Sequence, residues 1–194
     1  MTICPILKLG DTRLLDTSPH VGDINARQTQ NIIQDLLDTL KNTPAGAGLA
    51  APQIGHMQRI ILYHIPRERI TQEKNAQTIP YTILINPLYM PKKAETTLGL
   101  EGCLSLPNIR AVVPRYEHIL YTAQTPTGET IQGEASGFHA RVIQHECDHL
   151  DGILILKRID SLRHIGFTQE MHKRYDSTKE HAIRTDTAGS IHET

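Results

Sequence analysis

The chain has 194 residues, of which 39% are hydrophobic and 4% are aromatic, an apolar share that supports an aliphatic core and argues against wholesale disorder. A formal charge of −1 argues against a protein that coats nucleic acid or an anionic membrane, and no apolar run reaches the roughly 20 residues that cross a bilayer. Three cysteines are too few for a disulfide framework, and the first residues lack the pattern of a secretory signal, so a cytoplasmic protein is predicted.

The N-terminal third contains one clear helical pattern. Apolar residues with helical spacing predict a helix over residues 24–42, with Asp23 as its N-cap and with Pro44 and Gly46 at its end. The following segment, 46–55, is too rich in glycine for a stable helix interior. Short runs of β-forming residues separated by turn signals then predict strands at 59–65, 82–86, 110–113, 118–123 and 129–132.

The last third returns to helical spacing over residues 138–150, and Gly152 is expected to end this helix. Residues 153–156 are expected to form a short strand or an extended exit, and a last helix is expected from about 160 to 175. Because no helices separate the predicted strands, the class is α+β, with antiparallel sheets packed around the helix over 138–150. We expect one domain over 1–175 and a polar, flexible tail over 176–194.

The most specific local pattern is HECDH at residues 145–149. Residues four apart lie on one face of a helix, so His145 and His149 can bind one cation, and Glu146 can contact a water held by that cation. The alternative is a partly exposed helix with two ordinary histidines. Cys147 follows His145 by two residues and points away, so we interpret it, like Cys4, as a small buried hydrophobic residue.

A catalytic zinc or iron site usually has three protein ligands. A third histidine six residues after His149 would stand at position 155, which is Ile155, so that pattern fails. A downstream glutamate ligand would have to be Glu170 or Glu180, both in the weakly patterned C-terminal part. Cys103 is the better candidate, because its glycine-flanked position allows the backbone to approach a cofactor closely.

Three segments together resemble the signature motifs of the peptide deformylase family, in its type I-like bacterial and organellar form. They are GAGLAAPQIG at 46–55, EGCLSLP at 101–107 and QHECDHLDG at 144–152, and they occur in the family's order with similar spacing. Weaker similarity covers most of the chain, including INP at 85–87 and RAVVPR at 110–115.

The resemblance implies a hydrolase that removes the N-formyl group from the initiator methionine of new polypeptides and releases formate. A water bound to a divalent metal ion, Fe²⁺ natively with Zn²⁺, Ni²⁺ or Co²⁺ as substitutes, would be the nucleophile. Glu146 would act as general base and then as general acid. The Gln53 side-chain amide and the Leu104 backbone N–H would stabilise the oxyanion, although Gln53 alone looks like an ordinary polar loop residue. The implied metal ligands are Cys103, His145 and His149.

The substrate needs an apolar pocket for methionine and a strand edge for its backbone. Phe138 and Val142 precede the motif on the same helix and are candidates for the pocket, with core packing as the alternative. Gly46 and Gly48 either adopt positive φ in a turn or leave room for the peptide, and Ala47 replaces the larger aliphatic residue of many relatives. The other candidates for substrate binding or for orienting the site, with a surface ion pair as the alternative for the charged ones, are Glu101, Gly102, Arg110 and Arg115.

The implied partners are N-formylmethionyl nascent peptides and, transiently, the ribosome near its exit tunnel, with no membrane and no sequence-specific nucleic acid. Two other functions stay open on the sequence. One is a small H-E-x-x-H endopeptidase, and the other is an inactive, metal-binding module associated with the ribosome. A deformylase is favoured because the ligands, the base and the oxyanion donors occur together.

Overall fold

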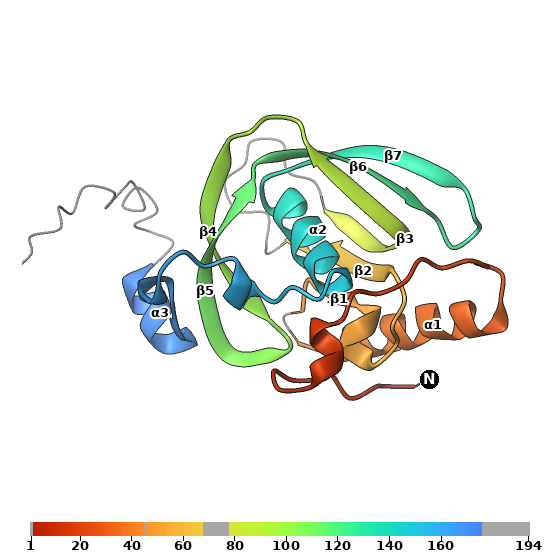
Figure 1. The fold of residues 1–194 in the computed structure, drawn as a ribbon, viewed down its shortest axis with the longest axis horizontal. Helices are drawn as coiled ribbons and strands as arrows, with labels where there is room; N and C mark the ends of the chain where they lie inside the picture. The colour runs from red at the N-terminus through yellow and green to blue at the C-terminus, as the bar shows by residue number, and fades with distance from the viewer. Residues whose placement is uncertain (1, 45, 68–77, 176–194) are drawn as a thin grey trace, which may run out of the picture.

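The structure is a computed structural model that describes residues 2–44, 46–67 and 78–175. In these residues, two antiparallel sheets enclose a central helix (Figure 1). One sheet has the strand order β1-β2-β3-β6-β7 and the other the order β4-β5-β8, and each pair of neighbours is antiparallel. The predicted α+β class is therefore confirmed. The strands are β1 (Gly48–Ala50), β2 (Ile60–Ile65), β3 (Ile79–Pro91), β4 (Thr96–Cys103), β5 (Leu106–Tyr116), β6 (His118–Gln124), β7 (Thr130–Ser136) and β8 (Ile165–Phe167).

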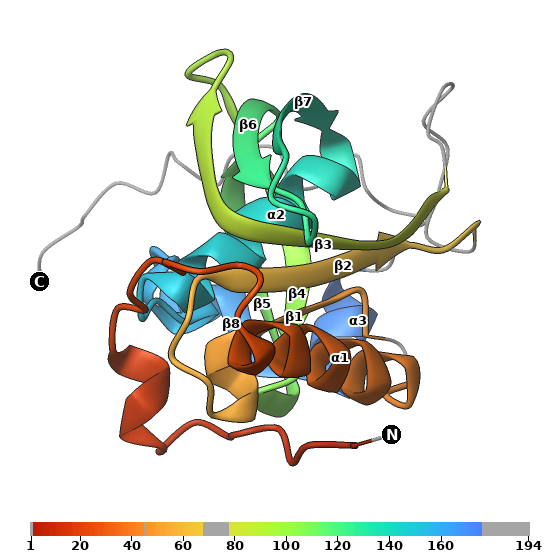
Figure 2. The ribbon, with the colours of Figure 1, turned by 90° about the vertical axis from the view of Figure 1, so that its right-hand side faces the viewer.

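Three α-helices and four short 3₁₀ helices accompany the sheets in these residues. They are α1 (Arg27–Lys41), α2 (Gly137–Leu150), α3 (Thr168–Arg174), η1 (Thr12–Leu15), η2 (Ala51–Ile54), η4 (Ile155–Lys157) and η5 (Leu162–His164). Figure 2 shows α1 and α2 on opposite sides of β1 and β2, and α2 also packs against β5 of the second sheet. Of the described residues, no helix combines the length and the apolar character needed to cross a membrane.

Alternation along β1 and β2 separates two hydrophobic cores. Leu49 and Leu62 pack in the cluster that contains the apolar face of α1, whereas Ala50 and Ile61 pack in the cluster that contains α2. Successive strand residues point to opposite faces, so the same two strands hold both helices. With β5 of the other sheet also packed against it, the C-terminal part of α2 is enclosed, and every residue over 142–150 is buried.

The helix α2 agrees with its predicted range to within one residue. It ends where Gly152 adopts a φ of +66°, a conformation that favours glycine. A Cβ atom at this position would also overlap with the backbone carbonyl of Leu15, so both the turn and the packing of the N-terminal segment require glycine here.

The helix α1 begins three residues later than predicted, and Asp23 is not its N-cap. Ala26 occupies that position without a side-chain cap, while the Asp23 carboxylate accepts a hydrogen bond from the Asn25 N–H at 2.9 Å in the preceding turn. The Asp23 carbonyl accepts a second bond, from the Thr29 hydroxyl, at 2.8 Å. Asp23 therefore stabilises the approach to the helix, and the helix itself is held by its buried apolar face.

The strand predictions locate most of the sheet but miss β1 and β4, and they shorten β3 and β5. Only Leu98 and Leu100 give β4 an apolar pattern, so its conformation comes from its pairing with β5. Gly99 is also needed within β4, because a Cβ there would lie 2.6 Å from the guanidinium carbon of Arg141. Strand formation that depends on pairing and packing is only weakly encoded in the residue types of the strand itself.

The C-terminal predictions need two corrections. No strand forms over 153–156: Leu154 is extended, and the 3₁₀ helix η4 begins at Ile155, which it buries. The helix expected over 160–175 is divided, because residues Ile165–Phe167 pair with β5 as β8 and leave only Thr168–Arg174 as a helix. The predicted tail, 176–194, lies outside the described residues.

Candidate metal centre and active site

The helix α2 places the two motif histidines side by side and away from solvent. The rings of His145 and His149 have centroids 5.0 Å apart and are inclined at 75° to each other. Both side chains are buried, His149 with 2% exposed. The spacing of four residues therefore gives one face with two imidazoles, as predicted, and the alternative of a partly exposed helix is wrong.

Cys103 is the last residue of β4, in the three-stranded sheet, and its side chain lies next to the two histidines of α2. Its Sγ atom lies 3.3 Å from Nε2 of His149, and the three ligand atoms of Cys103, His145 and His149 all lie within 4.8 Å of one another. Burial opposes ionisation of the thiol, but His149 and His145, through their charges and hydrogen bonds, hold the pKa of Cys103 well below its usual value. The thiolate is the form that binds metals.

These residues fit a divalent cation with one sulfur and two nitrogen ligands. One further atom supports this reading, because Oε2 of Glu146 is buried without a hydrogen-bond partner among the described residues. Buried polar atoms are rarely left unpaired, so the site is built to hold another group.

The other sequence candidates for a third ligand do not reach this point. Glu170 lies on α3, where its exposed carboxylate pairs with Lys173 at 2.8 Å, and Glu180 lies outside the described residues. Cys147 packs in the hydrophobic cluster around α2, and burial raises the pKa of its thiol far above the usual value. Cys4 packs partly buried beside α1, so both remaining cysteines behave as small hydrophobic residues, as predicted.

Glu101 orients the His145 ring by a hydrogen bond on the side away from the ligand cluster. Its Oε2 lies 2.9 Å from Nδ1 of His145, and because a carboxylate accepts, Nδ1 carries the proton and Nε2 faces the ligand cluster. Arg115 and Arg141 donate to Oε1 of Glu101 at 2.9 and 2.8 Å. Burial opposes the charge on Glu101, but the hydrogen bonds from His145 and Arg115 hold the pKa of this carboxyl far below its usual value.

Arg115 joins Glu101 to a second buried carboxylate. Its guanidinium also donates to Asp148 at 2.5 Å, and Arg158 donates to the same carboxylate at 3.0 Å through Nε. The Arg115 side chain is 3% exposed. The surface ion pair considered for Glu101 and Arg115 is therefore wrong, and the structure reveals Asp148 and Arg158 as members of the same network, which the sequence did not indicate.

Glu146 lies against the edge strand β1 at Gly48. Gly48 does not adopt positive φ, and a Cβ atom there would overlap with the Glu146 carboxylate. Glycine at position 48 thus leaves room for this side chain, and the alternative of positive φ is wrong for Gly48. Burial raises the pKa of Glu146 to about 7, so its carboxyl can both accept and release a proton near neutral pH.

Gln53 is buried beside the cluster and held at both ends of its amide. Its Oε1 accepts a hydrogen bond from the Ala50 N–H at 2.8 Å, and its Nε2 donates to the Ser105 hydroxyl at 3.1 Å and lies 3.8 Å from Sγ of Cys103. The interpretation as an ordinary polar loop residue is therefore wrong. Ser105 is fully buried and was missed, although it belongs to the EGCLSLP segment.

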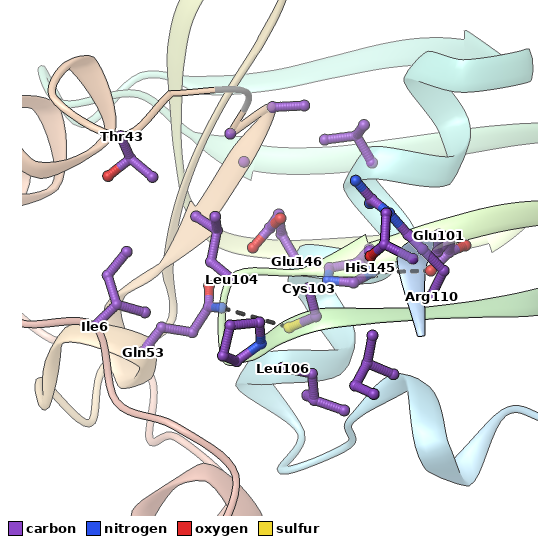
Figure 3. A pocket seen from close by; sticks show the side chains of 18 of the residues that line it. Ile6, Thr43, Gln53, Glu101, Cys103, Leu104, Leu106, Arg110, His145 and Glu146 are labelled. Carbon is purple, nitrogen blue, oxygen red and sulfur yellow. Dashed lines mark hydrogen bonds and ion pairs between the residues drawn. The ribbon is translucent and has the colours of Figure 1, made fainter. Parts of the chain in front are cut away.

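A cavity of about 470 Å³ opens beside these groups (Figure 3). Phe138 and Val142 line it and also pack in the cluster around α2, so packing in the core does not exclude a place in the pocket. Arg110 crosses Gly102, where a Cβ atom would overlap with its guanidinium. All eight residues predicted to bind substrate line the cavity: Gly46, Ala47, Gly48, Glu101, Gly102, Arg110, Phe138 and Val142. Lining residues that the sequence did not indicate include Lys8, Thr43, Asn108 and Thr168.

Comparisons with known sequences give a consistent family. A model of the polypeptide deformylase family matches residues 3–164. Peptide deformylase 2 of Pseudomonas putida is 43% identical over 166 residues, which are 84% of this chain and 92% of that protein. Peptide deformylase 2 of Bordetella bronchiseptica is 43% identical over 171 residues, 88% of this chain and 96% of that protein.

Solved structures agree with these sequences. The Met-Ala-Ser-bound class I type b peptide deformylase of Acinetobacter baumannii has a TM-score of 0.74 at 32% identity, over 81% of this chain and 99% of that one. The peptide deformylase of Ehrlichia chaffeensis has a TM-score of 0.76 at 26% identity, over 93% of this chain and 98% of that one. The chain therefore belongs to the polypeptide deformylase family, the enzymes that remove the N-formyl group from the amino terminus of new polypeptides.

Proposed function

We propose that this chain hydrolyses the formamide bond of N-formylmethionyl peptides and releases formate, with Cys103, His145 and His149 holding one divalent cation. The observation that carries the proposal is the convergence of this thiol and two imidazoles within 4.8 Å, beside the Glu146 carboxylate and inside one cavity. A cation bound there supplies a Lewis acid, which makes hydroxide available from water near neutral pH.

Glu146 acts as the general base and acid. It is buried, its Oε2 has no hydrogen-bond partner among the described residues, and a pKa of about 7 suits both directions of proton transfer. The carboxylate accepts a proton from the attacking water and then delivers it to the departing amine. Gly48 leaves the room in which this side chain lies.

The oxyanion formed at the formyl carbon accepts hydrogen bonds from Nε2 of Gln53 and from the Leu104 backbone N–H. Gln53 is supported for this role because its amide is oriented in advance by Ala50. Donors that are fixed before the reaction stabilise the developing charge without reorganisation, and the loss of one such donor typically lowers kcat by about 10²–10³-fold.

The peptide lies between the free edges of β1 and β4. Gly46, Ala47 and Gly48 offer backbone on one side, and Gly102 and Arg110 line the other. Phe138 and Val142 contact the methionine side chain, and the small Ala47 widens this part of the cavity. The second alternative, an endopeptidase, has no comparable support, because its expected glutamate ligand Glu170 lies on the surface.

Fe²⁺ is the native cation in this proposal, and Zn²⁺, Ni²⁺ or Co²⁺ can replace it, since a thiolate with two imidazoles suits each of these ions. The protein acts in the cytoplasm, where its three free cysteines stay reduced. It meets nascent chains near the ribosomal exit tunnel, because that is where formylated amino termini emerge. In this proposal the catalytic domain spans residues 1–175.

The test is formate release from formyl-Met-Ala-Ser by protein prepared without oxygen, with metal content measured on the same sample. Glu146→Ala is expected to keep the metal and abolish turnover, while Glu134→Ala, an exposed control, keeps both. A metal-replete wild-type protein that releases no formate would refute the proposal. Cleavage of casein that persists in Cys103→Ala would favour a peptidase instead.

A further inference from the structure

The two oxyanion donors come from different sheets. Gln53 belongs to η2, which follows the edge strand β1, and Leu104 lies in the turn between β4 and β5. These two sheets share no strand pairing in the part of the chain that the structure describes. Their relative position, on which two converging hydrogen bonds depend, must therefore be set by other contacts.

Three consecutive residues near the N-terminus make such contacts, in addition to the bond from Nε2 of Gln53 to the Ser105 hydroxyl and the packing of α2 against strands of both sheets. The Leu7 N–H donates to the carbonyl of Gln53 at 2.8 Å, and the Leu9 N–H donates to the carbonyl of Ser105 at 2.9 Å. Between them, the Lys8 ammonium donates to the carbonyl of Leu104 at 2.7 Å. Residues 7–9, here called the N-terminal strap, are thus bonded to both donor segments at once.

The side chains beside these bonds follow the same division. Ile6 packs with the cluster that contains α1, and Leu7 packs with the cluster that contains Cys103 and Leu106. Adjacent residues of an extended segment point to opposite sides, so the segment lies along the seam between the two sheets. Figure 3 shows Ile6 next to Gln53.

We propose that the N-terminal strap is a positioning element that sets the distance between the Gln53 amide and the Leu104 N–H. This inference rests on the proposed function, because it concerns how that reaction is stabilised. The strap does not touch the reacting atoms. Its loss is expected to lower kcat, which depends on the oxyanion, and to leave binding of the product peptide unchanged, because the product has no oxyanion.

The test compares variants that remove one hydrogen bond with controls that retain it. Leu9→Pro removes the N–H that bonds to Ser105, while Leu9→Ala keeps that N–H, and the Leu9 side chain is 53% exposed, so little packing is lost. Lys8→Met removes the ammonium and keeps the stem, while Lys8→Arg restores a cationic donor. The measurements are kcat and KM for formyl-Met-Ala-Ser, the Kd of Met-Ala-Ser, and hydrogen exchange over residues 103–106.

In Leu9→Pro and Lys8→Met, kcat is expected to fall about tenfold, with KM and Kd within about twofold of wild type. Lys8→Arg is expected to recover kcat relative to Lys8→Met, Leu9→Ala is expected to stay near wild type, and exchange over 103–106 should rise in Leu9→Pro. The proposal is overturned if kcat is equal in Leu9→Pro and Leu9→Ala, if kcat and product affinity fall together, or if exchange is unchanged. A wild-type protein without formate release refutes the proposed function, and exchange then still decides whether the strap holds this turn.

Discussion

Nδ1 of His145 donates a hydrogen bond to the Glu101 carboxylate at 2.9 Å, two residues before Cys103 on the same strand. One strand thus supplies a ligand and also the group that orients a second ligand. Since Arg115 and Arg141 hold Glu101 in turn, the orientation of the imidazole depends on a buried network of charges. Such partners of a metal-binding histidine fix its tautomer and raise its basicity.

Replacement of this partner should weaken metal binding. In Glu101→Gln, the amide presents N–H groups toward Arg115 and no longer holds a charge beside His145, so metal affinity is expected to fall about 10–100-fold. Competition with a chelator, without oxygen, measures this change. Glu129→Gln, on the exposed turn before β7, is the matched control. Equal affinities for the two variants would contradict the role of Glu101.

Removal of Arg115 should destabilise the fold strongly. Arg115→Met leaves Glu101 and Asp148 buried without one of their cations, and breaking such a buried network costs about 3–5 kcal/mol of unfolding free energy. Urea denaturation of the metal-free proteins measures it. The control is Lys92→Met, which breaks an exposed pair with Glu134 and should cost about 0–1 kcal/mol. Similar losses in both variants would contradict the buried network.

The sequence predicts α2 and its two histidines well, because a spacing of four residues is a local property of a helix. The position of Cys103 next to His149 is not local, since 46 residues separate them, and the sequence indicates it only through the glycine-flanked position of Cys103 and the resemblance of three motifs. The link from Asp148 to Arg115 could not be predicted at all, because the packing of α2 against β5 has to bring Arg115 to the helix first. That contact is created by tertiary packing, which a local pattern of residues does not indicate.

The glycine at position 48 illustrates the same limit. A glycine in a sequence suggests positive φ, whereas here its function is to leave room for a side chain 98 residues away. The backbone of Gly48 is ordinary strand, so alanine fits the chain locally, and the three atoms nearest to its Cβ all belong to Glu146. No local rule distinguishes these two uses of glycine.

Gly48→Ala should therefore reduce activity without loss of metal. The added methyl group displaces the Glu146 carboxylate, and a misplaced proton acceptor typically lowers kcat by about 10²-fold. Formate release and metal content, measured together, test this expectation. Gly22→Ala is the control, because no atom lies within 4 Å of its added Cβ. A Gly48→Ala protein with wild-type kcat would show that Glu146 does not need this position.

His139 should make stability depend on pH. Burial lowers the pKa of His139 to about 4, and its Nε2 lies 3.1 Å from the Tyr63 hydroxyl. Unfolded histidine has a pKa near ~6.5, so the unfolded chain binds more protons between these values, and stability falls as pH falls through this window. Because the side chain is partly exposed, the loss of unfolding free energy is at most about 2 kcal/mol.

His139→Gln cannot titrate and should reduce the difference in unfolding free energy between pH 7 and pH 4.5. The exposed control His118→Gln should retain the wild-type difference. Equal slopes in both variants would show that His139 stays accessible to protons in the folded state.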